Sequence, residues 1–191
     1  MKSINMDPKL VEQIAEHYRA IIQLIGEDPE REGLVKTPVR AAKALLENTR
    51  GYDEDPTGIL RAAMFEHEGS EIVIVKDIEF YSLCEHHLLP FFGRVSIGYI
   101  PEGKIVGLSK LGRIVDSFSR QFQVQERLTA EICDLLCSEL SQDVIVTCEA
   151  QHMCMKMRGV EKQGATTVTM QYRGQFEQDP ALRAEFLALC K

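Results

Sequence analysis

The segment Ser82–His87 holds residues that are well suited to bind a metal ion. Cys84 and His87 lie three positions apart at the end of a predicted strand, a spacing at which a thiolate and an imidazole can reach the same ion. A purely structural interpretation is also open, in which Cys84 is buried while His86 and His87 are exposed in a turn. A second group of ligands elsewhere in the chain would decide between the two.

Such a group stands in the segment 151–158, which we interpret as a strand because its residues alternate in chemistry. One predicted face carries the polar residues His152, Cys154, Lys156 and Arg158. The other carries three residues that we expect to pack in the core, namely Met153, Met155 and Met157.

Together the two segments predict a zinc site. Two thiolates and one imidazole would come from Cys84, Cys154 and His87, a set that suits zinc and leaves a fourth tetrahedral position open for water, as in catalytic sites. Zinc lowers the pKa of bound water to about 7. Beside the metal, two side chains suited to proton transfer near neutral pH remain, His86 and His152.

Cations gather at two places in a chain whose formal net charge is −7. Lys110 and Arg113 lie near the start of a predicted helix, and Lys156 and Arg158 follow Cys154. An extended strand would cover about 13 Å from Cys154 to Arg158, which is comparable with the reach from a purine base to a polyphosphate. Two further cations are interpreted as solvated on a helix face, Arg120 and Arg127.

Gln125 and Glu126 stand where the chain enters a predicted helix. Two interpretations of Glu126 are open: it favours the helix dipole, or it accepts two hydrogen bonds from the N1 and N2 edge of guanine. The chain contains neither the P-loop motif nor the GxGxxG motif. Phosphates would therefore be bound by side chains and a helix start, and a P-loop nucleotidase is excluded.

The elements that must position these residues are helical in the first third of the chain and mixed thereafter. Helices are predicted over 7–26 and 37–51, with a shorter one after Pro56. Strands begin at Glu71, two helices lie between 109 and 141, and two more strands precede a last helix capped by Asp179. The predicted fold class is α+β, an antiparallel sheet with two helices on one face, preceded by N-terminal helices.

A length of 191 residues is enough for one domain with its own core, and 45% hydrophobic and 27% charged residues are typical of globular proteins. The negative net charge argues against a nucleic-acid partner. Because the first ten residues lack a signal-peptide core and no apolar run is long enough to span a bilayer, we expect a cytoplasmic protein with no membrane partner. In that reducing compartment, the six cysteines predict no structural disulfide.

Six ordered motifs resemble the GTP cyclohydrolase I family and cover nearly the whole chain from Arg31 onward. They are REGLVKTPVRAAKAL, YSLCEHHLLPFFG, GLSKLGRIVDSFSR, QVQERLT, QHMCMKMRG and TTVT followed by EFL. The resemblance implies the tunnelling fold (T-fold, ββααββ), with a helical arm at 1–68 and the catalytic domain at 69–191. It also implies a homodecamer of two stacked pentamers, with active sites built from neighbouring subunits.

The resemblance also implies a role for each candidate residue. It makes Cys84, His87 and Cys154 the zinc ligands and makes His86 and His152 the acid and base groups. The positions that match triphosphate binding are Ser109, Lys110, Arg113 and Arg158, and those that match guanine binding are Gln125 and Glu126. In the implied reaction, zinc-bound water attacks C8 of GTP while His152 protonates the leaving ring nitrogen. Formate is released and 7,8-dihydroneopterin triphosphate forms, for folate or biopterin synthesis.

The chain departs from the family pattern at Gln121-Phe122, which leaves the role of Arg120 open, and it matches least up to about Glu30. One rival interpretation is a reductase of the same fold, which reduces a nitrile with a cysteine nucleophile and a nicotinamide cofactor and needs no zinc ligands. The other rival is a non-catalytic zinc module whose fourth ligand is His86 or Glu85.

Overall fold

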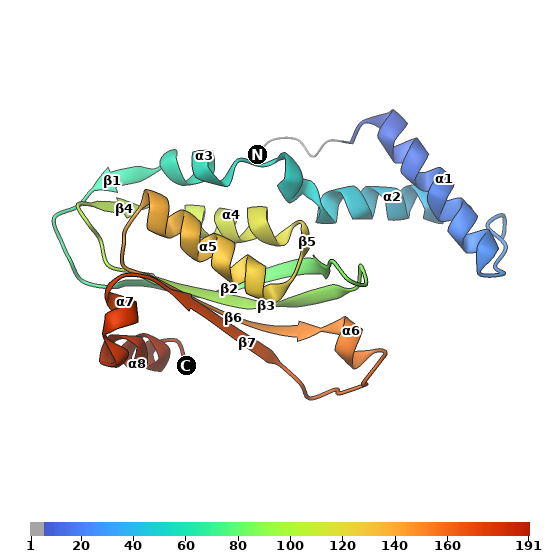
Figure 1. The fold of residues 1–191 in the computed structure, drawn as a ribbon. Helices are drawn as coiled ribbons and strands as arrows, with labels where there is room; N and C mark the ends of the chain where they lie inside the picture. The colour runs from blue at the N-terminus through green and yellow to red at the C-terminus, as the bar shows by residue number, and fades with distance from the viewer. Residues whose placement is uncertain (1–5) are drawn as a thin grey trace. The chain divides into compact units, whose positions relative to one another are not determined.

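The computed structural model describes residues 6–191, and the chain forms two compact units, Met1–Glu54 and Asp55–Lys191. The first unit is helical and the second contains the main sheet (Figure 1). Among the described helices, none combines the length and the apolar character that a bilayer span requires.

The first unit consists of α1 (Pro8–Leu24), α2 (Thr37–Asn48) and the short 3₁₀ helix η1 (Arg50–Asp53). Helix α1 begins as predicted, because the Asp7 side chain accepts a hydrogen bond from the Lys9 backbone N–H and proline occupies the first helical position. Its core is small and contains Val11, Ala15 and Ala42. The apolar stripe predicted for α1 is only partly buried, since Ile21 is 51% exposed and Leu24 85%.

The second unit is built around a five-stranded sheet in the order β5-β2-β3-β6-β7, in which β5 is parallel to β2 and all other pairs are antiparallel. Its strands are β2 (Val73–Cys84), β3 (Pro90–Tyr99), β5 (Phe122–Gln123), β6 (Val144–His152) and β7 (Thr167–Tyr172). A separate pair is formed by β1 (Met64–Glu66) and β4 (Lys104–Val106). The helices of this unit are α3 (Pro56–Arg61), α4 (Leu108–Ser119), α5 (Gln125–Glu139), α6 (Met153–Lys156), α7 (Gln175–Gln178) and α8 (Pro180–Leu189).

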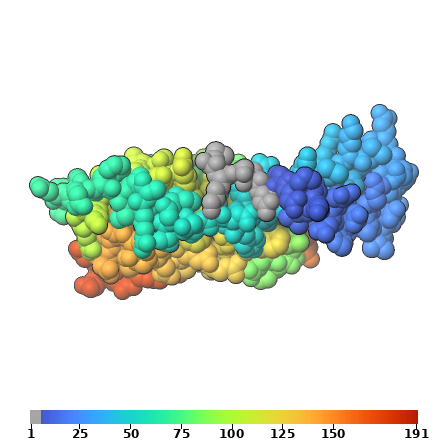
Figure 2. All heavy atoms as spheres, turned by 90° about the horizontal axis from the view of Figure 1, so that it is seen from above, coloured from blue at the N-terminus to red at the C-terminus, as the bar shows by residue number. Residues whose placement is uncertain are grey.

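Helices α4 and α5 pack on one face of the sheet (Figure 1). Seen from above, atoms of α3, α4 and α5 face the viewer over the second unit (Figure 2). The main core lies beneath them and includes Leu111 and Ile132 from the helices and Val95 and Val146 from the strands. Part of the opposite face is covered by the C-terminal segment, where α7 and α8 bury phenylalanines against Ile145. The unit is therefore a mixed α/β fold around a mostly antiparallel sheet.

The segment 151–158 differs from its prediction, because strand β6 ends at His152 and residues 153–156 form the helical turn α6. The β-branched run that favours a strand stops at Thr147, whereas methionine and lysine are good helix formers. The predicted packing of the methionines is also wrong for two of them, since Met155 is 37% exposed and Met157 63%.

Candidate metal centre and active site

The loop that follows β2 presents the first two candidate ligands. Cys84 is the last residue of β2, and its backbone closes a tight turn: its carbonyl accepts hydrogen bonds from the N–H groups of His87 and Leu88. Leu88 has a positive φ of 54° at the point where the chain reverses into β3. The turn brings His87 Nδ1 to 3.8 Å from Cys84 Sγ.

The third candidate ligand reaches the same place through strand pairing. Because β6 pairs with β3 in the register Phe91↔His152, the end of β6 lies beside the start of β3 and the loop that precedes it. Cys154, in the α6 turn just beyond, therefore meets the other two. One ligand atom from each of Cys84, His87 and Cys154 lies within 4.8 Å of the others.

The donor set of this cluster fits a zinc ion. Two thiols and one imidazole are soft ligands typical of zinc, and three protein ligands are the number found in catalytic rather than structural sites. Burial raises the pKa of the Cys154 thiol and the neighbouring Cys84 raises it further, whereas a bound metal ion would favour the thiolate of Cys154. Among residues 6–191, neither Glu85 nor His86 belongs to this cluster, contrary to what the closed zinc module requires.

His152 is held on two sides. Its ring stacks on Phe91, with centroids 4.7 Å apart and planes 4° from parallel. Its Nε2 lies 2.8 Å from Gln125 Oε1. Burial lowers the pKa of His152, and the nearby Glu126 carboxylate opposes that shift. The stacking and the contact with Gln125 fix the orientation of the ring.

Gln125 determines which nitrogen of His152 carries the hydrogen. The Gln125 amide nitrogen lies within hydrogen-bonding distance of three acceptors: the Cys148 carbonyl at 2.9 Å, the Thr167 carbonyl at 3.0 Å and the Thr169 hydroxyl at 3.2 Å. The oxygen of the same amide must therefore face His152 and can only accept, so His152 Nε2 donates. Gln125 is 1% exposed, whereas its neighbour Glu126 is exposed at the start of α5.

Two of the remaining predicted site residues, His86 and Arg158, lie close in sequence to the candidate metal ligands. His86 is exposed in the loop after β2, with Glu85 Oε1 3.7 Å from its Nε2. Arg158 follows α6 and is close enough to Cys154 to lower the pKa of that thiol. The prediction that Lys156 and Arg158 continue along an extended strand is wrong, because the α6 turn intervenes; Lys156 Nζ instead donates to Gln151 Oε1.

The predicted phosphate-binding residues of α4 lie away from this cluster. Ser109, Lys110 and Arg113 occupy the first half of α4, which begins beyond β4, near Tyr99 at the far end of β3. The end of α4 leads into β5, which pairs with Cys84 (Figure 1). At about 1.5 Å per residue, Lys110 lies about 14 Å before that end of the helix. The metal ligands and these cations therefore lie toward opposite ends of α4.

Two cations that were predicted to be solvated make specific contacts. Arg127 forms an ion pair with Glu85, at 2.7 Å between Nη2 and Oε2, and Arg120 lies over the Tyr81 ring. The sequence signal for the first was weak: Gln123, Arg127 and Glu131 repeat every four residues, a spacing that places them on one side of a helix start. Nothing in the sequence joined that group to Glu85.

The sequence is matched by clear relatives. The family model for GTP cyclohydrolase I matches residues 14–191. GTP cyclohydrolase 1 of Porphyromonas gingivalis is 56% identical over 178 residues, with 93% of this chain and 92% of that protein covered. The enzyme of the same name from Bacteroides fragilis is 53% identical (95% and 93% covered), and that from Drosophila melanogaster is 51% identical (94% and 56% covered). A solved archaeosine synthase QueF-Like structure covers 56% of this chain and 97% of its own, at 19% identity and a TM-score of 0.45. The chain belongs to the GTP cyclohydrolase I family of enzymes.

Proposed function

We propose that this enzyme opens the imidazole ring of GTP, releases C8 as formate and yields 7,8-dihydroneopterin triphosphate, with zinc held by Cys84, His87 and Cys154. The observation that carries the proposal is the convergence of these three side chains beside His152. When bound, zinc supplies Lewis acidity and lowers the pKa of a water molecule to about 7.

His152 is the proposed proton carrier. Hydrolysis of a ring C–N bond places the hydroxyl of water on C8 and a proton on the departing nitrogen. With Nε2–H held by Gln125, His152 can take up and release that proton only at Nδ1. The lowered pKa of His152 favours release of the proton. His86, exposed in the loop, is the second proposed acid or base for the hydrolysis that frees formate.

Substrate binding is proposed from the remaining residues. Glu126 is exposed at the start of α5 and can accept hydrogen bonds from the guanine edge. Gln125 stays a predicted base-binding residue, although its nitrogen is already bonded within the fold, so only its oxygen beside His152 could serve. The proposed triphosphate ligands are Ser109, Lys110, Arg113 and Arg158.

We further propose that neighbouring subunits share each site, within a decamer of two pentamers built from T-fold domains at 69–191, with a helical arm at 1–68. The position of Lys110 and Arg113 supports this, because both stand at the end of α4 that is away from the Cys84 loop. A second copy that brings its α4 start to the Cys84 loop would supply them.

The experiment is to incubate the purified protein with GTP and follow formate and the absorbance of a pterin. We expect one formate per GTP consumed, loss of activity with a zinc chelator and recovery when zinc is returned. Consumption of GTP to GDP and phosphate without formate would refute the proposed reaction. Activity that survives complete removal of the metal would refute the metal centre.

A further inference from the structure

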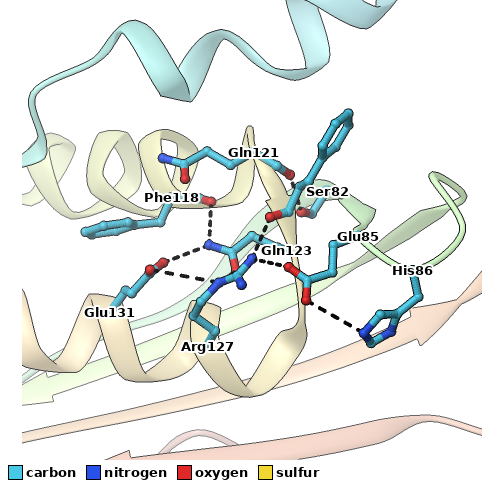
Figure 3. A network of polar contacts seen from close by, with 9 residues as sticks. Ser82, Glu85, His86, Phe118, Gln121, Gln123, Arg127 and Glu131 are labelled. Atoms are coloured by element: carbon cyan, nitrogen blue, oxygen red, sulfur yellow. Dashed lines mark hydrogen bonds and ion pairs between the residues drawn. The ribbon is translucent and has the colours of Figure 1, made fainter.

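The loop that carries His86 and His87 is tied to helix α5 by a network of polar contacts (Figure 3). The first of these contacts are backbone hydrogen bonds. Strand β5 pairs in parallel with the end of β2, and the Glu85 N–H donates to the Gln123 carbonyl over 3.0 Å. The two residues of β5 therefore connect the loop to the first turns of α5, where Arg127 lies.

Arg127 makes three short contacts around this connection, and its Nε also lies 4.0 Å from Glu131 Oε1. Its Nη2 lies 2.7 Å from Glu85 Oε2 and donates to the Phe122 carbonyl over 2.6 Å, while its Nε donates to Gln123 Oε1 over 2.9 Å. The guanidinium can serve all three because its donors form a rigid planar fork. The single ammonium of a lysine cannot reproduce that geometry.

Gln123 holds the guanidinium in place. This residue is fully buried, and its amide nitrogen donates to the Phe118 carbonyl over 3.1 Å and to Glu131 Oε2 over 2.7 Å. With the nitrogen so engaged, the amide oxygen points at Arg127. An ordinary exposed ion pair must order two long side chains and contributes little. Here the contacts with Gln123 and the Phe122 carbonyl already order the Arg127 side chain, so its pairing with Glu85 requires less additional ordering.

Glu85 connects Arg127 to the residues of the site. It stands between Cys84 and His86 in the chain, and its carboxylate bridges Arg127 and His86, with Oε1 3.7 Å from His86 Nε2. Arg127 pairs with Oε2 of this carboxylate while Oε1 faces His86, so a shift of the Glu85 side chain would change the surroundings of the exposed His86 ring. His87 follows directly, so a displaced loop would move it as well.

We propose that Arg127 is a positioning residue of this enzyme, acting through Glu85 to fix the loop that presents His87 to the metal and His86 to the substrate. This inference rests on the proposed function of the site. Residues that orient metal ligands from behind typically change metal affinity or activity by about 10–100-fold when they are replaced.

The test compares Arg127→Ala and Arg127→Lys with a matched control, Arg61→Ala. Arg61 also pairs with a glutamate, Glu139, here through two hydrogen bonds and at the opposite end of α5. Zinc affinity is measured without GTP, by competition with a chromophoric chelator, and cobalt spectra report the ligand geometry. We expect both Arg127 variants to bind zinc about 10–100-fold more weakly. Their kcat should fall by a larger factor than their KM changes. Arg61→Ala should match the parent.

A double variant separates positioning from general damage. If Arg127 acts through Glu85, adding Arg127→Ala to Glu85→Ala should cause little further loss of zinc affinity. If the losses of zinc affinity in the two single variants add in the double variant, the inference is overturned. It is also overturned if Arg127→Ala keeps the zinc affinity and kcat of the parent, or if Arg61→Ala loses as much as Arg127→Ala. If Arg127→Ala does not fold, Arg127→Lys decides by the same measurements. A parent protein that binds no zinc would refute the proposed metal centre and this inference with it, whereas zinc binding that ignores Arg127 refutes the inference alone.

Discussion

Replacing Gln125 by leucine should destabilise the protein and also remove the hydrogen bond that holds His152. Gln125 is buried, its amide nitrogen serves the Cys148 and Thr167 carbonyls, and its oxygen accepts from His152 Nε2. Leucine is close to glutamine in size and favours a helix, but it offers neither donor nor acceptor. The variant therefore removes the hydrogen bonds with little change in volume.

The size of the effect follows from the groups that lose a partner. The buried Cys148 carbonyl, the partly buried Thr167 carbonyl and one imidazole N–H lose a partner, and each such group costs about 1–3 kcal/mol. The carbonyls keep a second lone pair, so values near the lower limit apply to them. We expect the free energy of unfolding to fall by about 3–5 kcal/mol, a large share of the roughly 5–15 kcal/mol of a typical protein.

Urea denaturation at fixed protein concentration measures this loss, and nitrogen-detected NMR of the imidazole reports which ring nitrogen of His152 carries the hydrogen. The parent should show the Nε2–H form, and Gln125→Leu a mixture of the two tautomers with reduced turnover. Gln163→Leu is the control, because Gln163 is exposed and donates to the Lys156 carbonyl; its effect should stay within about 0.5 kcal/mol. A loss below about 1 kcal/mol in Gln125→Leu, or a parental Nδ1–H tautomer, would refute the reasoning.

Three further predictions concern single side chains. His152→Ala should keep its zinc by metal analysis but lose about 10²–10⁴ in turnover, whereas Cys154→Ala should lose the metal itself; the reverse pattern would exchange their roles. Glu126→Ala should weaken GTP binding by a few kcal/mol in a calorimetric titration, since the guanine donors lose their acceptor; unchanged affinity would make Glu126 a helix-start residue. Burial raises the pKa of Cys133 and Cys148 to about 12, so at pH 8 iodoacetamide should label Cys154 of the metal-free protein long before either of them, as mass spectrometry can check.

The proximity of Cys84 and His87 and most elements could be predicted because their signals are local. Asp55 and Asp179 cap helices that begin at the following prolines, as the sequence indicates. The Cys84 and His87 spacing needs only one turn to bring both side chains together, and the structure has that turn. Such features depend on neighbours within a few residues.

Features that depend on distant partners could not be predicted. The alternation His152, Cys154, Lys156 fits a strand, yet β7 pairs with β6 only as far as Ala150, and the chain beyond turns into α6. Arg127 resembles any solvated helix cation until β5 places it beside Glu85. The first outcome depends on where strand pairing stops, and the second on a contact between residues that are distant in sequence.

Lys110 lies on α4, away from Cys154. If subunits share each site as proposed, this location predicts how two mutant alleles behave when they are expressed together. Cys154→Ala and Lys110→Ala chains would carry their defects in different halves of the site. Assembled separately, each would be inactive throughout. Co-expressed chains would form mixed rings in which some sites combine an intact metal half with an intact phosphate half, so two null alleles would complement one another. Two alleles with defects in the same half would not.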